Sequence, residues 1–316
     1  MKRLTACWLQ AMFCLALLLA VPQLAVQAQD KPQTFQLTII HTNDFHDHEP
    51  YALARKATLI KKIREQNANV LLLDAGDLYT RGPYHKVFYG ELEMAAMNAM
   101  RYDAWELGNN EFKGETELAV ADEKLYRLID QSQFPVLCSN IKTDTGEYLA
   151  GVRPYTVKRV GGVNVGILGV SSLKVKKYPQ GANKRVEDPV DTARELLPQL
   201  QAESDIQIIL SHAGLSEDVK MDMKLAEKGI SLIIGADDHY VIERPIWRAG
   251  GVPIVQAGGE ENIYLGQIDL TFEKRNGKWV LVSQQGKLYH IDETIPMDAG
   301  IKAIIDRYLA TVKKAA

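Results

Sequence analysis

Five short apolar runs in this 316-residue chain each end, within a residue or two, in Asp, Asn or His. With their polar ends, the runs read LTIIHTNDFH (37–46), VLLLDAGD (70–77), AWELGN (104–109), IQIILSH (206–212) and ISLIIGADDH (230–239). Runs of this length that are rich in Leu, Ile and Val are typical of strands buried on both faces, as in a parallel sheet covered by helices. The pattern therefore favours an α/β fold.

The polar residues at these ends are candidate metal ligands. Ligands of a parallel sheet bind where the carboxyl ends of its strands meet. An Asp or Asn after a strand also serves ordinary turns, where it hydrogen-bonds the local backbone. Five ends of this kind in one chain favour the metal interpretation over five independent turns. The predicted ligands of a two-metal site are Asp44, His46, Asp77, Asn109, His212, Asp237 and His239.

Helical and strand patterns alternate between these runs. Amphipathic or helix-like stretches predict helices near 52–66, 86–100, 116–130, 189–202, 217–228 and 298–313. The segment 156–170 predicts a hairpin that turns at Gly161 and Gly162, and three late strands are expected over 252–258, 264–273 and 278–285. Parallel βα units followed by antiparallel strands predict two packed sheets with helices outside, a four-layer α/β/β/α sandwich.

Residues 1–28 have the composition of a secretory signal peptide. Two basic residues precede an apolar stretch that contains AMFCLALLLAV (11–21), and VQA (26–28) fits a cleavage site. The stretch is short and flanked wrongly for a membrane span, although an uncleaved anchor is the alternative. We therefore expect 29–316 to be a single exported domain, periplasmic or secreted, without a membrane span after cleavage.

Charge and cysteine content narrow the class of protein further. Loss of the signal segment removes Lys2 and Arg3 and leaves 35 basic and 40 acidic residues, a formal net charge of −5 in place of −3. This mild acidity gives no electrostatic footprint for nucleic acid. Cys138 would be the single remaining cysteine, so an internal disulfide is excluded and stability must come from the hydrophobic core.

Five motifs in a fixed order carry a family resemblance. HTNDFH, AGD with Gly82, GNNEF, SHAG and IGADDH resemble the five blocks of the calcineurin-like metallophosphoesterase superfamily, and HTND with VPIVQAGGEENIYLGQIDL points to its 5′-nucleotidase branch. The resemblance covers about residues 36 to 273. It implies a metallophosphatase-type sandwich that binds two divalent ions (Mn, Zn, Fe or Co). Carried over by position, one metal would be held by Asp44, His46 and His239, the other by Asn109, His212 and Asp237, with Asp77 bridging the two.

The resemblance also implies a reaction. Two dications ionise a bound water near neutral pH, direct it at phosphorus and neutralise charge on the transferring group. The expected function is an exported, binuclear-metal-dependent hydrolase of small phosphate monoesters, nucleotides among them, with metal-bound hydroxide as nucleophile. Most 5′-nucleotidase relatives carry a C-terminal domain that binds the base, and this chain ends after one helix, so nucleotide specificity is not carried over.

Three departures from the family lie inside the motifs. The third block of the family reads Gly-Asn-His-Glu-Phe-Asp, whereas Asn110 and Lys113 stand here in place of its His and its last Asp. Asn110 can donate a hydrogen bond but cannot deliver a proton to a leaving group. At the second metal, Asp237 stands where the family usually has His, and the neighbouring Asp238 is an alternative ligand.

Two residues are the predicted catalytic candidates, Asn110 and His48. His48 lies two positions past His46, where its imidazole would act as the missing acid, with a solvated loop residue as the alternative. Glu111 is expected to brace the Asn109 loop. Two other functions stay open: a metal-retaining pseudoenzyme that binds a phosphorylated ligand or partner, and a hydrolase of a non-phosphate anion such as a thiosulfate conjugate.

Overall fold

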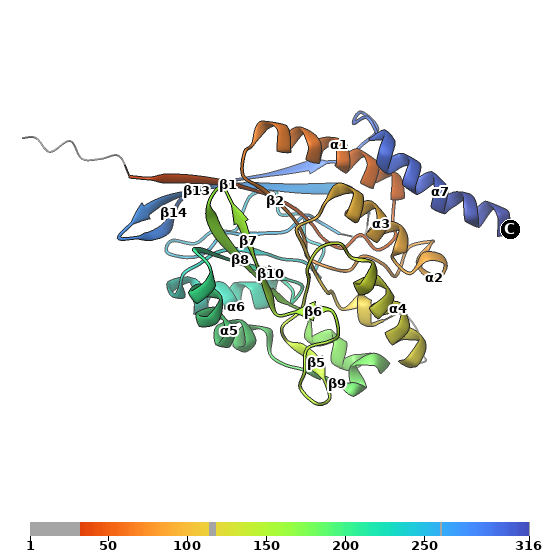
Figure 1. Cartoon of the computed structure of the whole chain (residues 1–316), viewed down its shortest axis with the longest axis horizontal. Helices are drawn as coiled ribbons and strands as arrows, with labels where there is room; N and C mark the ends of the chain where they lie inside the picture. The colour runs from red at the N-terminus through yellow and green to blue at the C-terminus, as the bar shows by residue number, and fades with distance from the viewer. Residues whose placement is uncertain (1–31, 114–117, 260, 316) are drawn as a thin grey trace, which may run out of the picture. The chain divides into compact units, whose positions relative to one another are not determined.

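Two central β-sheets organise the part of the chain that spans Thr34–Ala316 (Figure 1). The structure is a computed structural model that describes residues 32–113, 118–259 and 261–315. The predicted signal peptide, 1–28, lies outside the described residues.

The first sheet has seven strands and is parallel over most of its width. In spatial order the strands are β14 (Lys278–His290), β13 (Tyr264–Arg275), β1 (Thr34–Thr42), β2 (Val70–Asp74), β3 (Ala104–Glu106), β4 (Val136–Leu137) and β6 (Val152–Arg153). The neighbours from β1 to β6 pair in parallel, whereas β13 runs antiparallel to both β1 and β14. Asn276 and Gly277 turn this last hairpin with φ of 51° and 81°, as a two-residue turn between twisted strands requires.

The second sheet has five strands. Their spatial order is β12 (Ile254–Val255), β11 (Ile230–Ile234), β10 (Ile206–Ser211), β8 (Val163–Val170) and β7 (Tyr155–Val160). The strands from β12 to β8 run parallel, and β7 forms an antiparallel hairpin with β8 across Gly161 and Gly162 as predicted. A separate antiparallel pair is formed by β5 (Ile141–Thr143) and β9 (Lys184–Val186).

Helices cover the outer faces of the two sheets. The α-helices are α1 (Pro50–Gln66), α2 (His85–Phe88), α3 (Glu91–Met100), α4 (Leu118–Gln131), α5 (Pro189–Glu203), α6 (Leu215–Leu225) and α7 (Ala299–Ala315). Short 3₁₀ turns are η1 (Asn110–Phe112), η2 (Leu173–Lys177), η3 (Pro179–Asn183) and η4 (Ala226–Lys228). Helices α1, α3 and α7 pack against one another, and in Figure 1 they lie on the opposite side of the strands from α5 and α6.

Alternation along the buried strands produces three apolar layers. In β1, Ile40 faces the helical layer that contains α1, α3 and α7, while Ile39 faces the other sheet. In β10, Ile208 packs in the same inter-sheet layer and Ile209 packs against α5 and α6. Both faces of the central strands are therefore buried, which confirms the predicted four-layer α/β/β/α sandwich.

Several elements are shorter than the sequence pattern suggests. The expected helix 86–100 is two helices, because Tyr89 and Gly90 adopt left-handed backbone angles between α2 and α3. The expected strand 252–258 is a strand only over Ile254–Val255, and Ala257 adds an isolated bridge to Val241. The chain after the strand contacts Asn43, which accepts from Ala257 N–H and donates to the Gly258 carbonyl. These contacts bring the 257–259 loop to the first motif.

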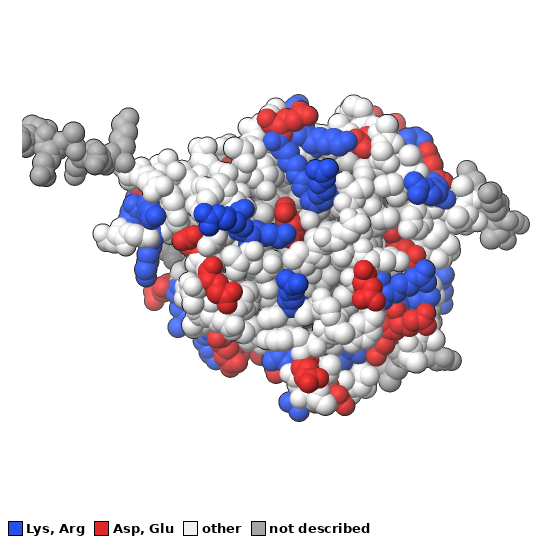
Figure 2. Space-filling model, viewed as in Figure 1, with Lys and Arg blue, Asp and Glu red and all other residues white. Residues whose placement is uncertain are grey.

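Surface charge and helix hydropathy are both unexceptional. On the face drawn in Figure 2, basic and acidic side chains are interspersed, and neither sign gathers into one field. Among the described residues, no helix combines the length and apolar character needed to cross a bilayer.

Candidate metal centre

The seven predicted ligands follow five strands whose carboxyl ends meet. Asp44 and His46 follow β1, Asp77 follows β2, Asn109 follows β3, His212 follows β10, and Asp237 and His239 follow β11. Four of these side chains thus come from the first sheet and three from the second. All seven are buried except His239 and Asp237, which are partly exposed at the rim.

Two groupings of these side chains have ligand atoms that all lie within 4.8 Å of one another. The first contains Asp44, His46 and His239. His239 Nε2 lies 3.2 Å from Asp44 Oδ1 and 3.1 Å from His46 Nε2. Three donors at such spacing could hold a cation, and they are the three residues predicted for the first metal position.

The second grouping contains Asp44, Asp77 and His212. His212 Nε2 lies 3.2 Å from Asp77 Oδ2 and 3.9 Å from Asp44 Oδ1. Asp77 Oδ2 also lies 3.7 Å from His46 Nε2, so this carboxylate stands between the two groupings. The position suits the bridging role that the sequence predicts for Asp77.

Asp237 and Asn109 lie next to this second grouping. Asp237 Oδ1 is 3.9 Å from His212 Nε2. With its amide nitrogen turned toward Asp237, Asn109 donates to Asp237 Oδ1 over 2.7 Å and accepts from the Tyr178 hydroxyl over 3.2 Å. The opposite amide orientation points the Asn109 oxygen at Asp237, an arrangement of two acceptors that a cation stabilises.

Unpaired buried atoms provide a test of whether a metal fits here. Asp44 Oδ1 and His212 Nε2 are buried and make no well-aligned hydrogen bond among the described residues, although His239 Nε2 and Asp77 Oδ2 lie 3.2 Å from them. Such groups are costly inside a protein unless something satisfies them. Carboxylate, imidazole and amide donors without a thiolate suit Mn, Zn, Fe or Co. The residues therefore fit divalent cations.

A backbone contact fixes the orientation of one imidazole. His212 Nδ1 lies 2.6 Å from the Ala75 carbonyl, which can only accept a hydrogen bond. Nδ1 therefore carries a proton, and Nε2 faces Asp44 and Asp77, where it can bind a metal ion once its own proton is lost. This is the arrangement by which proteins orient metal-binding histidines.

Five of the seven predicted ligands have left-handed backbone angles. The φ values are 52° for Asp44, 52° for His46, 62° for Asp77, 79° for Asp237 and 59° for His239. Residues other than glycine avoid this region, and where they adopt it they cluster at functional sites. The loops after β1, β2 and β11 are therefore bent so that successive side chains turn toward one point.

Glu111 braces the Asn109 loop, as the sequence predicts, and also the loop that carries Asp77. Its carboxylate accepts N–H bonds from Asp77 (3.0 Å), Leu78 (2.7 Å) and Gly108 (2.7 Å). Burial, and then the neighbouring Asp77, raise the pKa of Glu111 to about 8. Gly108 is required at this place, because a Cβ there would lie 2.1 Å from Asp77 Oδ1.

The histidines and carboxylates of the centre shift one another's titration. Burial alone raises the pKa of Asp44, but His212, His239 and His46 outweigh it and hold that pKa well below its ordinary value. Burial lowers the pKa of His212, yet Asp77 and Asp44 raise it well above its ordinary value overall. Protons and metal ions therefore compete for the same donors.

The two predicted catalytic residues lie in different surroundings. Asn110 is 1% exposed, and its backbone N–H and side-chain amide both donate to the carboxylate of Asp77. His48 is partly exposed in the loop before α1. Its pKa is lowered by burial and then by nearby His46, and within the described ranges its ring makes no hydrogen bond to a predicted ligand.

Three other residues near the motifs lie at the edge of the centre or outside it. Asp238 accepts the Leu215 N–H over 2.6 Å at the start of α6, and belongs to neither ligand grouping. Lys113 is exposed, with its ammonium 5.8 Å from the Tyr178 ring. Asp74 accepts from Thr42 and from the Gly76 N–H, so it holds the turn after β2.

The structure adds three residues that the sequence pattern did not single out. Ser172, Lys174 and Tyr178 follow β8, the strand next to β10. Ser172 Oγ and Lys174 Nζ both contact Asp237, over 3.4 Å and 2.7 Å. The available signal was positional, because β8 is parallel to β10 and its carboxyl end opens at the same edge.

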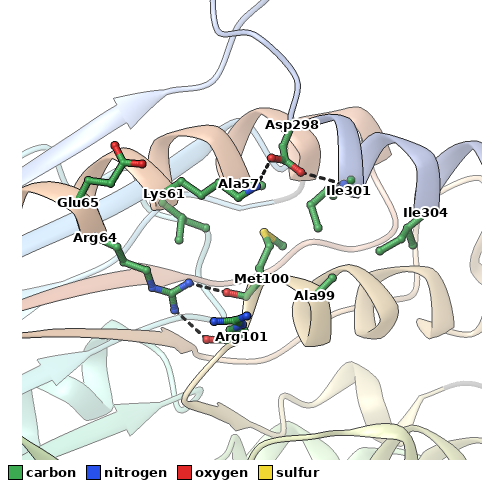
Figure 3. A pocket seen from close by; sticks show the side chains of 12 residues that line it. Ala57, Lys61, Arg64, Glu65, Ala99, Met100, Arg101, Asp298, Ile301 and Ile304 are labelled. Atoms are coloured by element: carbon green, nitrogen blue, oxygen red, sulfur yellow. Dashed lines mark hydrogen bonds and ion pairs between the residues drawn. The ribbon is translucent and has the colours of Figure 1, made fainter.

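A pocket elsewhere on the molecule contains none of these residues. It lies between α1, α3 and α7, where Figure 3 shows Arg64 bonded to the Met100 and Arg101 carbonyls and Lys61 paired with Asp298. Two of its basic groups, those of Lys61 and Arg64, are thus already paired with protein atoms. The strand-end cluster remains the candidate site.

Comparison with known proteins agrees with this geometry. The family model for calcineurin-like phosphoesterases matches residues 37–241. This chain belongs to the calcineurin-like phosphoesterase family. Within the family it is similar to human 5′-nucleotidase, with 30% identity over 318 residues that cover 87% of this chain and 52% of the human protein.

Solved phosphoesterase structures share the fold. The 5′-nucleotidase precursor from Thermus thermophilus gives a TM-score of 0.77 at 25% identity, covering 89% of this chain and 59% of that one. The calcineurin-like phosphoesterase YfkN from Bacillus subtilis gives 0.73 at 27% identity, covering 88% and 98%. This phosphoesterase chain therefore resembles the N-terminal domain of 5′-nucleotidases and spans about half the length of its human relative.

Proposed function

We propose that this chain is an exported, binuclear-metal-dependent hydrolase of small phosphate monoesters, nucleotides among them. The observation that carries the proposal is the pair of ligand groupings that share Asp44, with Asp77 between them, in a calcineurin-like phosphoesterase. Two divalent cations at such a site supply an activated water and neutralise charge on the phosphoryl group.

The side chains of this site have separate tasks in the proposed reaction. Asp44, His46 and His239 hold one cation, Asn109, His212 and Asp237 hold the other, and Asp77 is shared. Glu111 fixes the two loops that carry Asp77 and Asn109, so the geometry exists before substrate arrives.

Substrate meets the rim of the centre. The ammonium of Lys174 and the ring of Tyr178 lie beside the second grouping, with Lys113 over that ring. Cationic and hydroxyl donors at this place suit phosphoryl oxygens and an attached organic group. The named activity of relatives such as human 5′-nucleotidase makes nucleotides the first substrates to assay.

Proton delivery to the leaving group is the weak step of this reaction. Asn110 cannot act as an acid, and its amide is already bonded to Asp77. This bond is also the observation that favours the second candidate function, a metal-retaining pseudoenzyme that binds a phosphorylated ligand. His48 is the proposed acid of the enzyme, carried by the loop that follows His46.

An assay with two leaving groups tests the proposal. The purified chain, loaded with Mn²⁺ or Zn²⁺, is offered 4-nitrophenyl phosphate, whose leaving group needs no proton, and AMP, whose leaving group does. We expect metal-dependent hydrolysis of both, with AMP slower by up to about 10²–10⁴ where acid catalysis is poor. If neither ester turns over while elemental analysis finds bound metal, the pseudoenzyme remains, and a thiosulfate conjugate offered in parallel tests the third possibility.

Export is tested separately from chemistry. Residues 1–28 support it by composition, with a cleavage site after VQA (26–28). Expression of the full chain in a bacterium, followed by fractionation and intact-mass measurement, should yield a periplasmic or secreted product that lacks these residues. A full-length product retained with the cells would contradict the proposal.

A further inference from the structure

Lys174 places a positive charge at the position predicted for the second metal. The residue lies in η2 (Leu173–Lys177), just past the carboxyl end of β8. Its Nζ is 2.7 Å from Asp237 Oδ1. The Lys174 side chain is 47% exposed, whereas that of Asp237 is 5% exposed, so a chain that starts in solvent delivers its ammonium to a buried carboxylate.

The oxygen that Lys174 contacts is the one that a second cation needs. Asp237 Oδ1 is 3.9 Å from His212 Nε2 and 2.7 Å from the side-chain amide of Asn109. Asp237, His212 and Asn109 are the three ligands predicted for the second metal position. His212 and Asn109 therefore both lie close to the oxygen that Lys174 contacts. An ammonium has three donors and no lone pair, so it can only compete with a metal ion there and cannot share in binding it.

The competing state is already complete in its hydrogen bonding. Lys174 Nζ donates to Asp237 Oδ1, and Ser172 Oγ donates to Asp237 Oδ2. The Asn109 amide also donates to Asp237 Oδ1 when its nitrogen is turned toward that carboxylate. A metal would require the Asn109 amide to rotate so that its oxygen faces inward.

We propose that the ammonium of Lys174 occupies the second metal position when that position holds no metal. The two metal ions then bind one after the other, and Lys174 lowers the affinity for the second ion. The inference rests on the two-metal centre of the proposed function. Departure of the lysine needs little rearrangement, since its stem is half-exposed and flexible. Asp237 keeps its place, because its backbone N–H donates to Asp44 Oδ2 over 3.2 Å.

Replacement of the Lys174 ammonium by a second metal ion changes the net charge of the centre. Asp44, Asp77 and Asp237 carry three negative charges, which one dication and the lysine together offset. A second dication displaces the ammonium of Lys174, which then remains at the rim. Together the two dications and the ammonium leave the centre with two positive charges in excess. A phosphate monoester dianion offsets that excess, so substrate and second metal should bind with positive coupling.

Metal titration of the full chain tests the inference without any assay of turnover. Isothermal titration calorimetry with Mn²⁺, together with electron paramagnetic resonance to count bound Mn²⁺, should resolve a tight first step and a weaker second step. Lys174→Met should strengthen the second step by roughly 10- to 100-fold and leave the first unchanged, the range found when groups around metal ligands are altered. Lys174→Arg should keep the second step weak, because the charge is retained.

Lys176 offers a matched control on the same 3₁₀ turn. It is exposed, and Lys176→Met should leave both steps as in the parent chain. Lys174→Gln provides a second neutral variant if Lys174→Met does not fold by circular dichroism. An unchanged or weakened second step in a folded neutral variant would overturn the inference.

The outcomes separate this inference from the proposed function. Tighter second-site binding in Lys174→Met, with no phosphatase activity in any form, would support the role of the lysine and refute the enzyme. Phosphatase activity, with an affinity for the second metal ion that does not depend on Lys174, would support the enzyme and refute the role of the lysine.

Discussion

Asn110 donates its backbone N–H and its side-chain amide to the two carboxylate oxygens of Asp77, the backbone bond being 2.7 Å long. Asp77 Oδ2 also lies 3.2 Å from His212 Nε2. The residue that stands in place of the family's His therefore holds a predicted bridging ligand in position. Its side chain does not extend toward the rim.

Removal of this amide should weaken metal binding. Asn110→Ala deletes the donor to Asp77 Oδ2 and keeps the backbone N–H bond, so the fold should persist. We expect the affinity for Mn²⁺ to fall by about 10- to 100-fold. Calorimetric titration measures the change, and Asn183→Ala, in an exposed part of η3, should bind as the parent does. Equal affinity in Asn110→Ala would show that the bond does not position Asp77.

The acid role proposed for His48 predicts an effect that depends on the leaving group. In His48→Ala, hydrolysis of AMP should fall by about 10²–10⁴ while hydrolysis of 4-nitrophenyl phosphate stays unchanged. Steady-state rates with both esters measure the ratio, and His290→Ala, in which an exposed imidazole is lost, serves as control. If both esters keep their rates in His48→Ala, His48 is a solvated loop residue.

Glu111→Gln should destabilise the whole ligand edge. The three backbone N–H groups that converge on Glu111 would lose one of its two acceptor oxygens, and the new amide would turn a donor toward donors. The expected loss is about 2–5 kcal/mol of unfolding free energy. Chemical denaturation followed by circular dichroism measures it, with Glu65→Gln on the exposed side of α1 as control. A loss below about 0.5 kcal/mol, which is ordinary for a surface substitution, would contradict the bracing role.

Asp218 predicts a pH dependence of stability. It is buried at the start of α6 and accepts from Ser211 Oγ over 2.6 Å, and burial raises its pKa from 3.8 to about 8, with Asp238 and Asp237 adding to the rise and His212 opposing it. The folded state thus favours the protonated acid. Stability from this group is complete below pH 3.8 and is lost as pH rises toward 8, by about 1.4 kcal/mol per pH unit.

Asp218→Asn keeps an acceptor for Ser211 and removes the ionisation. The variant should therefore gain on the parent as pH rises from 4 to 8. Thermal melting across this range measures the difference, and Asp144→Asn, at an exposed position, should follow the parent. A constant offset between the Asp218→Asn and parent melting curves would indicate that Asp218 is ionised in the fold throughout.

The strand ends could be predicted because buried strands leave a strong apolar signal. Ile206–Ser211 and Val70–Asp74 lie where the sequence pattern puts them, since both faces of each strand are covered. A short edge strand leaves a weaker signal, and only Ile254–Val255 of the expected 252–258 run forms a strand. The other apolar residues of the 252–258 run are buried in a loop, so their composition resembles that of a strand.

The direction of side chains was harder to predict than their position. The sequence brings Asn110 to the third motif but does not reveal that its amide is bonded to Asp77. Lys174 was missed because an interrupted segment of 3₁₀ turns carries no periodic signal, and the contact to Asp237 is between residues 63 positions apart. Such long-range pairs follow from the sheet order, which the sequence indicates only in outline.

The division of the ligands between the two sheets has a mechanical consequence. Asp44, His46, Asp77 and Asn109 move with the first sheet, whereas His212, Asp237 and His239 move with the second, and the Ala75 carbonyl joins the sheets through His212. A fragment with one sheet would hold an incomplete set of donors. Metal affinity is thus a measure of how closely the sheets are aligned, and a small slippage in the layer around Ile208 should alter it before any strand unfolds.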